Sequence, residues 1–370
     1  MKLAAVSVLL LLMLTGCTAE NQLKNLQLVY ATSIDINDNN DIVATVTIQS
    51  PGGKERNVPE HEIISATGAT MQEALNNKIG QQIAGTIGTS KNQVMLLSER
   101  LAKQDLTEIL DSAVRLSDDP MLAKVAIVRG DSSDLIRLKR VGSATAGEYL
   151  RKIIQSARHD SIIPAMTLHT LFPLLHDNGR DAVLPILKKE GDKAVVDGMG
   201  LLHKRKFTGY TLTSKQSTLA LLLNDNKGKT CVITRRVKVD DNEGPGDYMG
   251  LNIVNLKRKK QVWLDDSGQV QVRFVVKMKA SILEYADSSH LAGEYDTKEL
   301  GKRFSEILME DAQGIFKQLL KSHSDAYGIA RDIMAHYPEA WAKMDWETEY
   351  PKTNFQAQIA VEIVSKGIIN

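Results

Sequence analysis

The chain has 370 residues, of which 43% are hydrophobic and 25% are charged, and its formal net charge at pH 7 is +1. These proportions are typical of globular proteins that bury a hydrophobic core. A nearly neutral chain is not expected to bind nucleic acid by neutralising phosphates. Its only cysteines are Cys17 and Cys231, which excludes a framework of several disulfides.

The N-terminus has the order of a secretory signal peptide. Lys2 precedes a nearly uninterrupted apolar run from Leu3 to Leu14, which is too short to span a bilayer as a mature helix. The sequence Leu-Thr-Gly-Cys ending at Cys17 resembles a bacterial lipobox, in which the cysteine is alkylated with diacylglycerol and the chain is cleaved before it. We therefore expect residues 1–16 to be removed and Cys17 to carry lipid chains such as palmitate. Two acyl chains anchor a protein stably, whereas one does so only marginally.

Hydrophobic periodicity in the first half predicts a mixed sheet. Two alternating strands, Leu26 to Ile36 and Ile42 to Gln49, are joined by an Asn- and Asp-rich turn. Strands and helices then alternate, which implies right-handed crossovers and a partly parallel sheet with helices against it. The expected strands are 63–67, 93–98 and 123–129, and the expected helices begin at the capping box Thr70 to Glu73 and span 101–116.

The second half predicts further sheet and helix elements. Residues 144–180 are expected to be mainly helical, and a short helix is expected at 214–223. Strands are expected at 183–203, 229–239, 251–264, 270–285 and 355–364, and helices at 296–322 and 324–336. The pattern predicts an α+β or mixed α/β chain with several domains. We place a tether at 17–25, an N-terminal mixed α/β domain at 26–190, a middle β-rich domain at 191–265 and a C-terminal α+β domain at 266–370.

The sequence offers no motif for catalysis, a metal or a cofactor. Gly228-Lys-Thr230 lacks the upstream glycine of a phosphate-binding loop, because Leu223 occupies that position. His61-Glu62 lacks the second histidine of a zinc-protease helix, because Ser65 stands there. No nucleophile and base can be paired from known motifs. We therefore expect a protein that is not an enzyme and that needs no cofactor.

Two conspicuous features are interpreted as structural. The basic run from Lys257 to Lys260 is typical of a solvated edge or turn in a β segment, and contact with anionic lipid headgroups is the alternative. Cys231 lies in an apolar, strand-like run, which favours a small buried side chain over a reactive thiol.

The end of the chain carries an ordered series of residues that resembles a known family. The series is Asp325-Ala-Tyr-Gly328, His336-Tyr-Pro-Glu-Ala-Trp341, Asp345-Trp-Glu347, Tyr350-Pro351 and Phe355 to Ile363 with Gly367. It looks like the end of the Ger(x)C family, the lipoprotein C subunits of nutrient germinant receptors in endospore-forming bacteria. Residues 65–68 and 197–212 and the lipobox also agree, so the resemblance covers nearly the whole mature chain.

The resemblance implies a three-domain mixed α/β architecture and a lipid anchor in the spore inner membrane, on its outer face. It also implies two integral-membrane partners, an A-type and a B-type receptor subunit, and a role in nutrient-triggered germination through protein–protein contacts. The candidate interface or structural residues are Asp325, Tyr327, Gly328, Tyr337, Pro338, Trp341 and Trp346.

The residue types of this series suggest mainly architectural roles. Trp341 and Trp346 can each bury a large area and are expected to fix the last helix to the terminal strand. Gly328 is expected to permit close helix packing, and Pro338 to end a helix.

A function of a different class stays open. A solute-binding lipoprotein could capture a small-molecule germinant, although such proteins typically have two similar lobes and this sequence shows no internal duplication. A lipoprotein hydrolase ranks lower, because no nucleophile–base constellation can be proposed. An anchored, neutral chain without a recognisable site favours a role in protein contacts.

Overall fold

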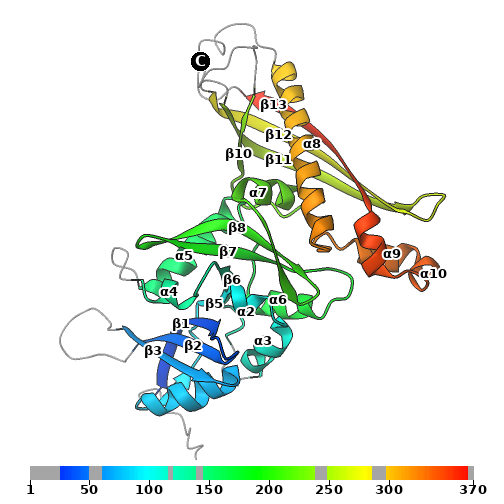
Figure 1. Ribbon diagram of the computed structural model, residues 1–370. Coiled ribbons are helices and arrows are strands. Elements are labelled where there is room, and N and C mark those ends of the chain that lie inside the picture. The colour runs from blue at the N-terminus through cyan, green and yellow to red at the C-terminus, as the bar shows by residue number, and fades with distance from the viewer. Residues whose placement is uncertain are drawn as a thin grey trace, which may run out of the picture.

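The computed structural model describes residues 26–49, 61–115, 120–138, 145–237, 248–285 and 297–365. The predicted signal peptide, the tether at 17–25 and Cys17 lie outside these residues. The described residues form two β-sheets with helices packed on them (Figure 1). Within the same ranges, the helices are all too short or too polar to cross a membrane. The predicted mixed α+β class is confirmed.

The first sheet has nine strands within the described residues, in the order β3-β2-β1-β5-β6-β7-β8-β9, with β4 beside β1. They are β1 (Leu26–Ile36), β2 (Ile42–Gln49), β3 (His61–Gly68), β4 (Thr86–Gly88), β5 (Val94–Ser98), β6 (Lys124–Val128), β7 (Val183–Glu190), β8 (Lys193–His203) and β9 (Lys206–Leu212). Strands β1, β5, β6 and β7 run parallel to one another, and antiparallel pairing with β2 and β3 at one end and with β8 and β9 at the other extends the sheet. The predicted partly parallel sheet is therefore confirmed.

Helices cover both faces of this sheet. They are η2 (Glu73–Ile79), η3 (Gly80–Gln82), α2 (Glu99–Ala102), α3 (Leu106–Val114), α4 (Ser133–Ile136), α5 (Ala146–His159) and α6 (Leu168–Leu175). Along β5, Val94 and Leu96 join the hydrophobic cluster that contains α5, whereas Met95 and Leu97 join the cluster that contains α3 and α6. The strand is buried on both faces because successive side chains point in opposite directions.

The predicted helix at 101–116 differs from the structure. It consists of two helices, α2 and α3, because Asp105 starts a second helix by accepting a hydrogen bond from the Thr107 N–H at 2.9 Å. The helix predicted at Thr70 does begin with a box of side-chain bonds. The Glu73 N–H donates to Thr70 Oγ1 at 3.1 Å, and the Ala69 N–H donates to the Glu73 carboxylate at 2.9 Å.

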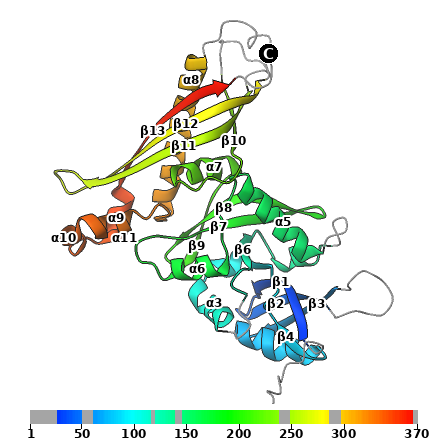
Figure 2. The ribbon, with the colours of Figure 1, turned by 180° about the vertical axis from the view of Figure 1, so that it is seen from behind.

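The second sheet has the order β10-β11-β12-β13. Its strands are β10 (Val232–Arg236), β11 (Tyr248–Leu264), β12 (Val270–Tyr285) and β13 (Asn354–Ser365). The predicted turn at residues 265–268 closes the β11–β12 hairpin, and β13 returns parallel to β12. Helix α8 (Thr297–Lys321) lies along one face, and the opposite face faces the viewer in Figure 2. The crossover from α8 to β13 contains α9 (Ile329–His336), α10 (Pro338–Trp341), α11 (Trp346–Glu349) and η4 (Tyr350–Lys352).

Helix α7 (Ser214–Leu223) lies between the two sheets (Figure 1). Its residues from Ser217 to Leu223 are all buried, as expected for a helix that is apolar on every side. The Thr213 hydroxyl accepts from the Gln216 N–H, and the Gln216 side chain accepts from the Thr213 N–H, so both sides of a capping box are present. Its leucines belong to one continuous cluster that includes residues of both sheets.

The predicted middle domain at 191–265 is divided in the structure. Strands β8 and β9 extend the first sheet by antiparallel pairing with β7 and with each other, whereas β10 and β11 belong to the second sheet. The change between the sheets falls at α7. Local strand patterns do not specify which sheet a strand joins, and the change of sheet falls inside the predicted middle domain.

The basic run at 257–260 is not a turn, because it lies inside β11. Arg258 points toward the core, donates to the Leu223 carbonyl at 2.8 Å and lies 5.5 Å from the Phe274 ring centre. Lys260 also points inward and donates to the Tyr327 carbonyl at 2.8 Å. Lys257 and Lys259 are exposed on the opposite face. The prediction that this run is solvated is therefore confirmed for Lys257 and Lys259, and it is wrong for Arg258 and Lys260. Cys231 is buried, as predicted.

Two glycines of α8 provide a matched test of how that helix packs on β13. A Cβ at Gly301 would lie 2.5 Å from the Val361 carbonyl oxygen, whereas a Cβ at Gly314 would meet nothing within 4 Å. Gly301→Ala should therefore lower the free energy of unfolding by about 1–3 kcal/mol. Gly314→Ala should raise it by about 0.5–1 kcal/mol, because alanine favours the helix. Thermal unfolding of both variants measures these changes in stability. Tm shifts in the same direction would contradict the close contact between Gly301 and β13.

Candidate functional site at the junction of the two sheets

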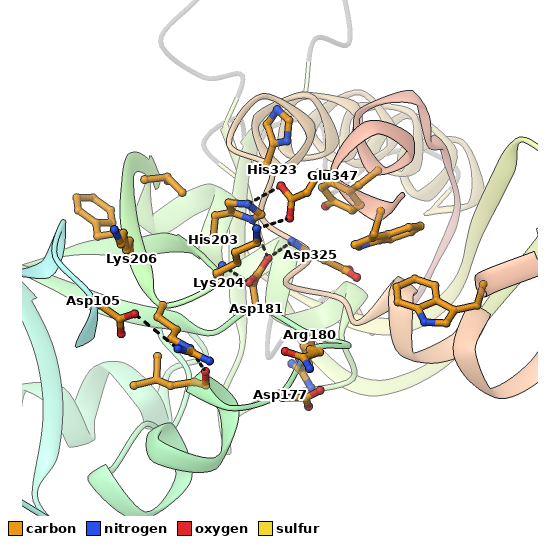
Figure 3. A pocket seen from close by; sticks show the side chains of 18 residues that line it. Asp105, Asp177, Arg180, Asp181, His203, Lys204, Lys206, His323, Asp325 and Glu347 are labelled. Carbon is orange, nitrogen blue, oxygen red and sulfur yellow. Dashed lines mark hydrogen bonds and ion pairs between the residues drawn. The ribbon is translucent and has the colours of Figure 1, made fainter. Parts of the chain in front are cut away.

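A cavity of about 750 Å³ lies where the first sheet meets the C-terminal helices (Figure 3). Four parts of the chain line it: the α2–α3 loop, the α6–β7 loop with the end of α6, the β8–β9 turn with the start of β9, and the stretch from His323 to Tyr350. A cavity of this size between two structural units is a common place for a binding site. It is therefore the candidate functional site.

Hydrogen bonds between residues 177–181 and 325–331 close one side of the cavity. We call these two segments the junction contact. The Asp181 N–H donates to the Asp325 carbonyl at 3.0 Å, and the Asp325 N–H donates to the Asp181 carboxylate at 2.8 Å. The Arg331 N–H donates to the Gly179 carbonyl at 3.1 Å, and the Arg331 side chain forms an ion pair with Asp177. The two sheets are thus joined by polar contacts as well as by α7.

Asp325 organises the start of α9. Its carboxylate accepts hydrogen bonds from the Ile329 and Ala330 N–H groups, each at 2.8 Å. Burial, together with a smaller effect of the nearby Asp181, raises the pKa of Asp325 to about 7 against the lowering effect of these two bonds. The helix predicted at 324–336 therefore begins only at Ile329, because the preceding residues form its capping turn.

Gly328 has a different role from the predicted one. Its φ of +66° is left-handed, a conformation that residues with a side chain rarely adopt. It permits the turn between Asp325 and α9 and is not a point of close helix packing. Pro338 is the first residue of α10 and follows the end of α9, as predicted.

A group of charged side chains ties the β8–β9 turn to α11. His203 Nε2 lies 3.0 Å from a Glu347 carboxylate oxygen, and Lys204 Nζ lies 2.9 Å from the other. The Lys204 N–H donates to Asp181 at 2.6 Å, and His203 Nδ1 is 3.5 Å from the same carboxylate. Asp181, and secondarily Glu347, raise the pKa of His203 against the opposing effect of burial. Burial tends to raise the pKa of Glu347, but Lys204 and His203 hold it below its usual value.

Aromatic rings connect the cavity to β13. The ring centres of Trp341 and Trp346 are 5.7 Å apart, and those of Trp346 and Tyr350 are 5.4 Å apart. Tyr350 is buried, packs against Phe355 of β13 and donates from its hydroxyl to the Ser324 carbonyl at 2.6 Å. The two tryptophans therefore connect the last helices to the terminal strand, as their size predicted.

The structure brings only some of the predicted residues to the cavity. Asp325, Trp341 and Trp346 line it. Tyr327 is buried, with its ring centre 4.8 Å from that of Phe274, and Tyr337 is half-buried against the same hydrophobic cluster. These two residues, Gly328 and Pro338 are not among the residues that line the cavity.

Four lining residues that carry the polar chemistry were not among the predicted site residues: Arg180, Asp181, His203 and Glu347. They come from loops that are distant in the sequence, and no local pattern marks Arg180 or Asp181. His203 and Glu347 lie in segments that carry the family resemblance, but the resemblance gave neither residue a role. In the part of the chain that the structure describes, no three His, Cys, Asp or Glu side chains lie close enough together to hold a metal ion.

Two family models match this chain. "Spore germination protein N-terminal domain" matches residues 19–189, and "Spore germination B3/GerAC like, C-terminal" matches residues 197–367. The chain belongs to the Ger(x)C family of spore germination proteins.

Known relatives of this Ger(x)C chain match it over nearly its full length. Spore germination protein GerQC of Bacillus cereus is 22% identical, over 96% of both chains. Spore germination protein KC of Bacillus subtilis (strain 168) is 20% identical, over 100% of this chain and 96% of its own. The crystal structure of the GerBC protein superposes with a TM-score of 0.59 at 16% identity, over 90% of this chain and 96% of GerBC. The fold is therefore the same.

The raised pKa values of Asp325 and His203 predict that stability falls as the pH rises. Both groups bind protons more tightly in the folded state than in the unfolded state, so their contribution is greatest at low pH. For Asp325 the loss develops between its ordinary pKa of 3.8 and its folded value of about 7. It amounts to at most about 4 kcal/mol.

Thermal unfolding between about pH 4 and pH 7 tests this dependence. Asp325→Asn cannot ionise, so its Tm should fall less steeply with pH than that of the parent protein. Asp266→Asn, at an exposed position in the β11–β12 turn, is the matched control and should keep the parent slope. Equal slopes for the two variants would show that Asp325 does not titrate in this range.

Proposed function

We propose that this protein is the lipid-anchored C subunit of a spore nutrient germinant receptor, and that nutrient-triggered germination requires it. The observation that carries the proposal is membership of the Ger(x)C family over nearly the whole chain, at residues 19–189 and 197–367. The relatives named as spore germination proteins extend over almost the same length.

The proposed anchor is Cys17, carrying diacylglycerol, at the outer face of the spore inner membrane. The lipobox-like sequence before Cys17 supports this assignment, and two acyl chains are sufficient for stable attachment. The proposed partners are an A-type and a B-type integral-membrane subunit.

The proposed mode of action is protein contact without catalysis. The charged groups at the junction mainly hold other parts of the same chain: Asp181 bridges to Asp325, and Glu347 binds the β8–β9 turn. Such pairs fix the arrangement of the two sheets. A fixed arrangement lets one subunit present separate surfaces to two partners at once.

The alternative is a solute-binding lipoprotein, and the cavity at the junction is the observation in its favour. The two sheet units are unlike, because one is a nine-stranded mixed sheet and the other a four-stranded sheet within the described residues. Solute-binding proteins typically have two similar lobes. The receptor subunit is therefore the first proposal.

Deletion and complementation in spores test the proposal. Deletion should abolish or slow nutrient-triggered germination and leave germination by a receptor-independent trigger intact. A Cys17→Ala copy should not restore the response, because the protein is released from membranes or stays unprocessed. A Cys231→Ala copy, which changes the other cysteine, should restore it. Loss of both germination responses, or membrane-bound Cys17→Ala protein of mature size, would contradict the proposal.

A further inference from the structure

The acidic side chains that line the junction cavity already have partners. Glu347 binds Lys204 and His203, Asp105 lies 3.7 Å from Arg205, and Asp177 pairs with Arg331. Asp181 and Asp325 accept hydrogen bonds from backbone N–H groups. Each of these acidic side chains is therefore already ion-paired or hydrogen-bonded within the chain.

Arg180 differs from these acidic side chains, because part of its polar group has no partner in the described part of the chain. It is half-buried in the cavity wall, and its Nε donates to the Ala326 carbonyl at 3.1 Å. Among the described residues, its two terminal nitrogens have no hydrogen-bond partner, and no carboxylate forms an ion pair with it. Burial lowers the pKa of Arg180, although the charge of Asp325 acts in the opposite direction. A desolvated guanidinium with unused donors is suited to bind a planar anion in bidentate fashion.

The C-terminal helices line the cavity with aromatic rings. Trp341 and Trp346 line the cavity and are half-buried, with Tyr350 behind them. Figure 3 shows Arg180 beside Asp177, on the side of the cavity that the first sheet provides. A ligand held by both walls needs an anionic group and an apolar body, which excludes an inorganic anion as a good fit.

We propose that the junction cavity binds a small organic carboxylate, with its carboxylate on the Arg180 guanidinium and its apolar part against Trp341 and Trp346. The volume of about 750 Å³ is within the range of small-molecule sites and too small for a folded partner. Arg180 belongs to the first sheet unit and the tryptophans to the second, so the bound ligand bridges the two. The proposal does not depend on receptor assembly, because binding is a property of this chain alone.

Benzoate is the probe, and benzamide, its neutral isostere, is the matched control ligand. Two of the three tryptophans of the chain line the cavity, so intrinsic fluorescence reports binding directly. Benzoate should change this fluorescence saturably, with a Kd of about 1 mM or tighter, and should raise Tm. Benzamide should bind at least about tenfold more weakly, because it lacks the charge that Arg180 recognises. Absence of a saturable response to benzoate, or equal binding of benzamide, would overturn the proposal.

Three variants locate the site. Arg180→Gln should weaken benzoate binding at least about tenfold. Arg273→Gln removes an arginine that lies 5.2 Å from the ring centre of the third tryptophan, Trp263, outside the cavity, and should leave binding unchanged. Trp341→Leu should weaken the binding of benzoate and of benzamide to the same extent, because both ligands place the same ring against Trp341. This variant tests the site even if Arg180→Gln unfolds the junction contact. Parent-like benzoate affinity in Arg180→Gln or in Trp341→Leu would overturn the proposal.

Discussion

The arrangement of this protein depends on two aspartates that bind each other's backbone segments. Asp181 and Asp325 are 144 positions apart in the chain, and each N–H donates to an oxygen of the other residue. The Asp325 carboxylate also binds the first two N–H groups of α9. Loss of either aspartate leaves buried polar groups without partners, at a cost of about 1–3 kcal/mol for each group. The cavity, the aromatic wall and the charged turn at His203 all lie around this contact.

The apolar helix α7 provides the second constraint. From Ser217 to Leu223 it is buried on every side, and it joins residues of both sheets into one hydrophobic cluster. Burial of apolar area is not directional, so it holds the sheets together without specifying their angle. The directional hydrogen bonds of the junction contact supply that specificity. The arrangement of the two sheets in this chain thus rests on one apolar and one polar contact.

Much of the fold follows from local patterns. The alternation of residues 26–36 and 42–49 predicts β1 and β2, and the bounds of α7 agree with the helix predicted at 214–223. The α2–α3 break and the left-handed Gly328 depend on single capping and turn residues that periodicity does not register. The division of the strands at α7 and the position of Arg180 depend on contacts between distant segments. The resemblance pointed to Asp325, Trp341 and Trp346, but it did not show that these residues share a cavity with Arg180.

We propose that this chain is a subunit of a membrane receptor complex. Purification of the mature, lipidated protein from detergent-solubilised spore inner membranes, followed by mass spectrometry of the proteins that accompany it, tests this claim most directly. The account predicts that multi-span A-type and B-type receptor subunits co-purify with it. A protein that leaves the membrane without them, carrying only a bound small molecule, would contradict the account and favour the solute-binding function.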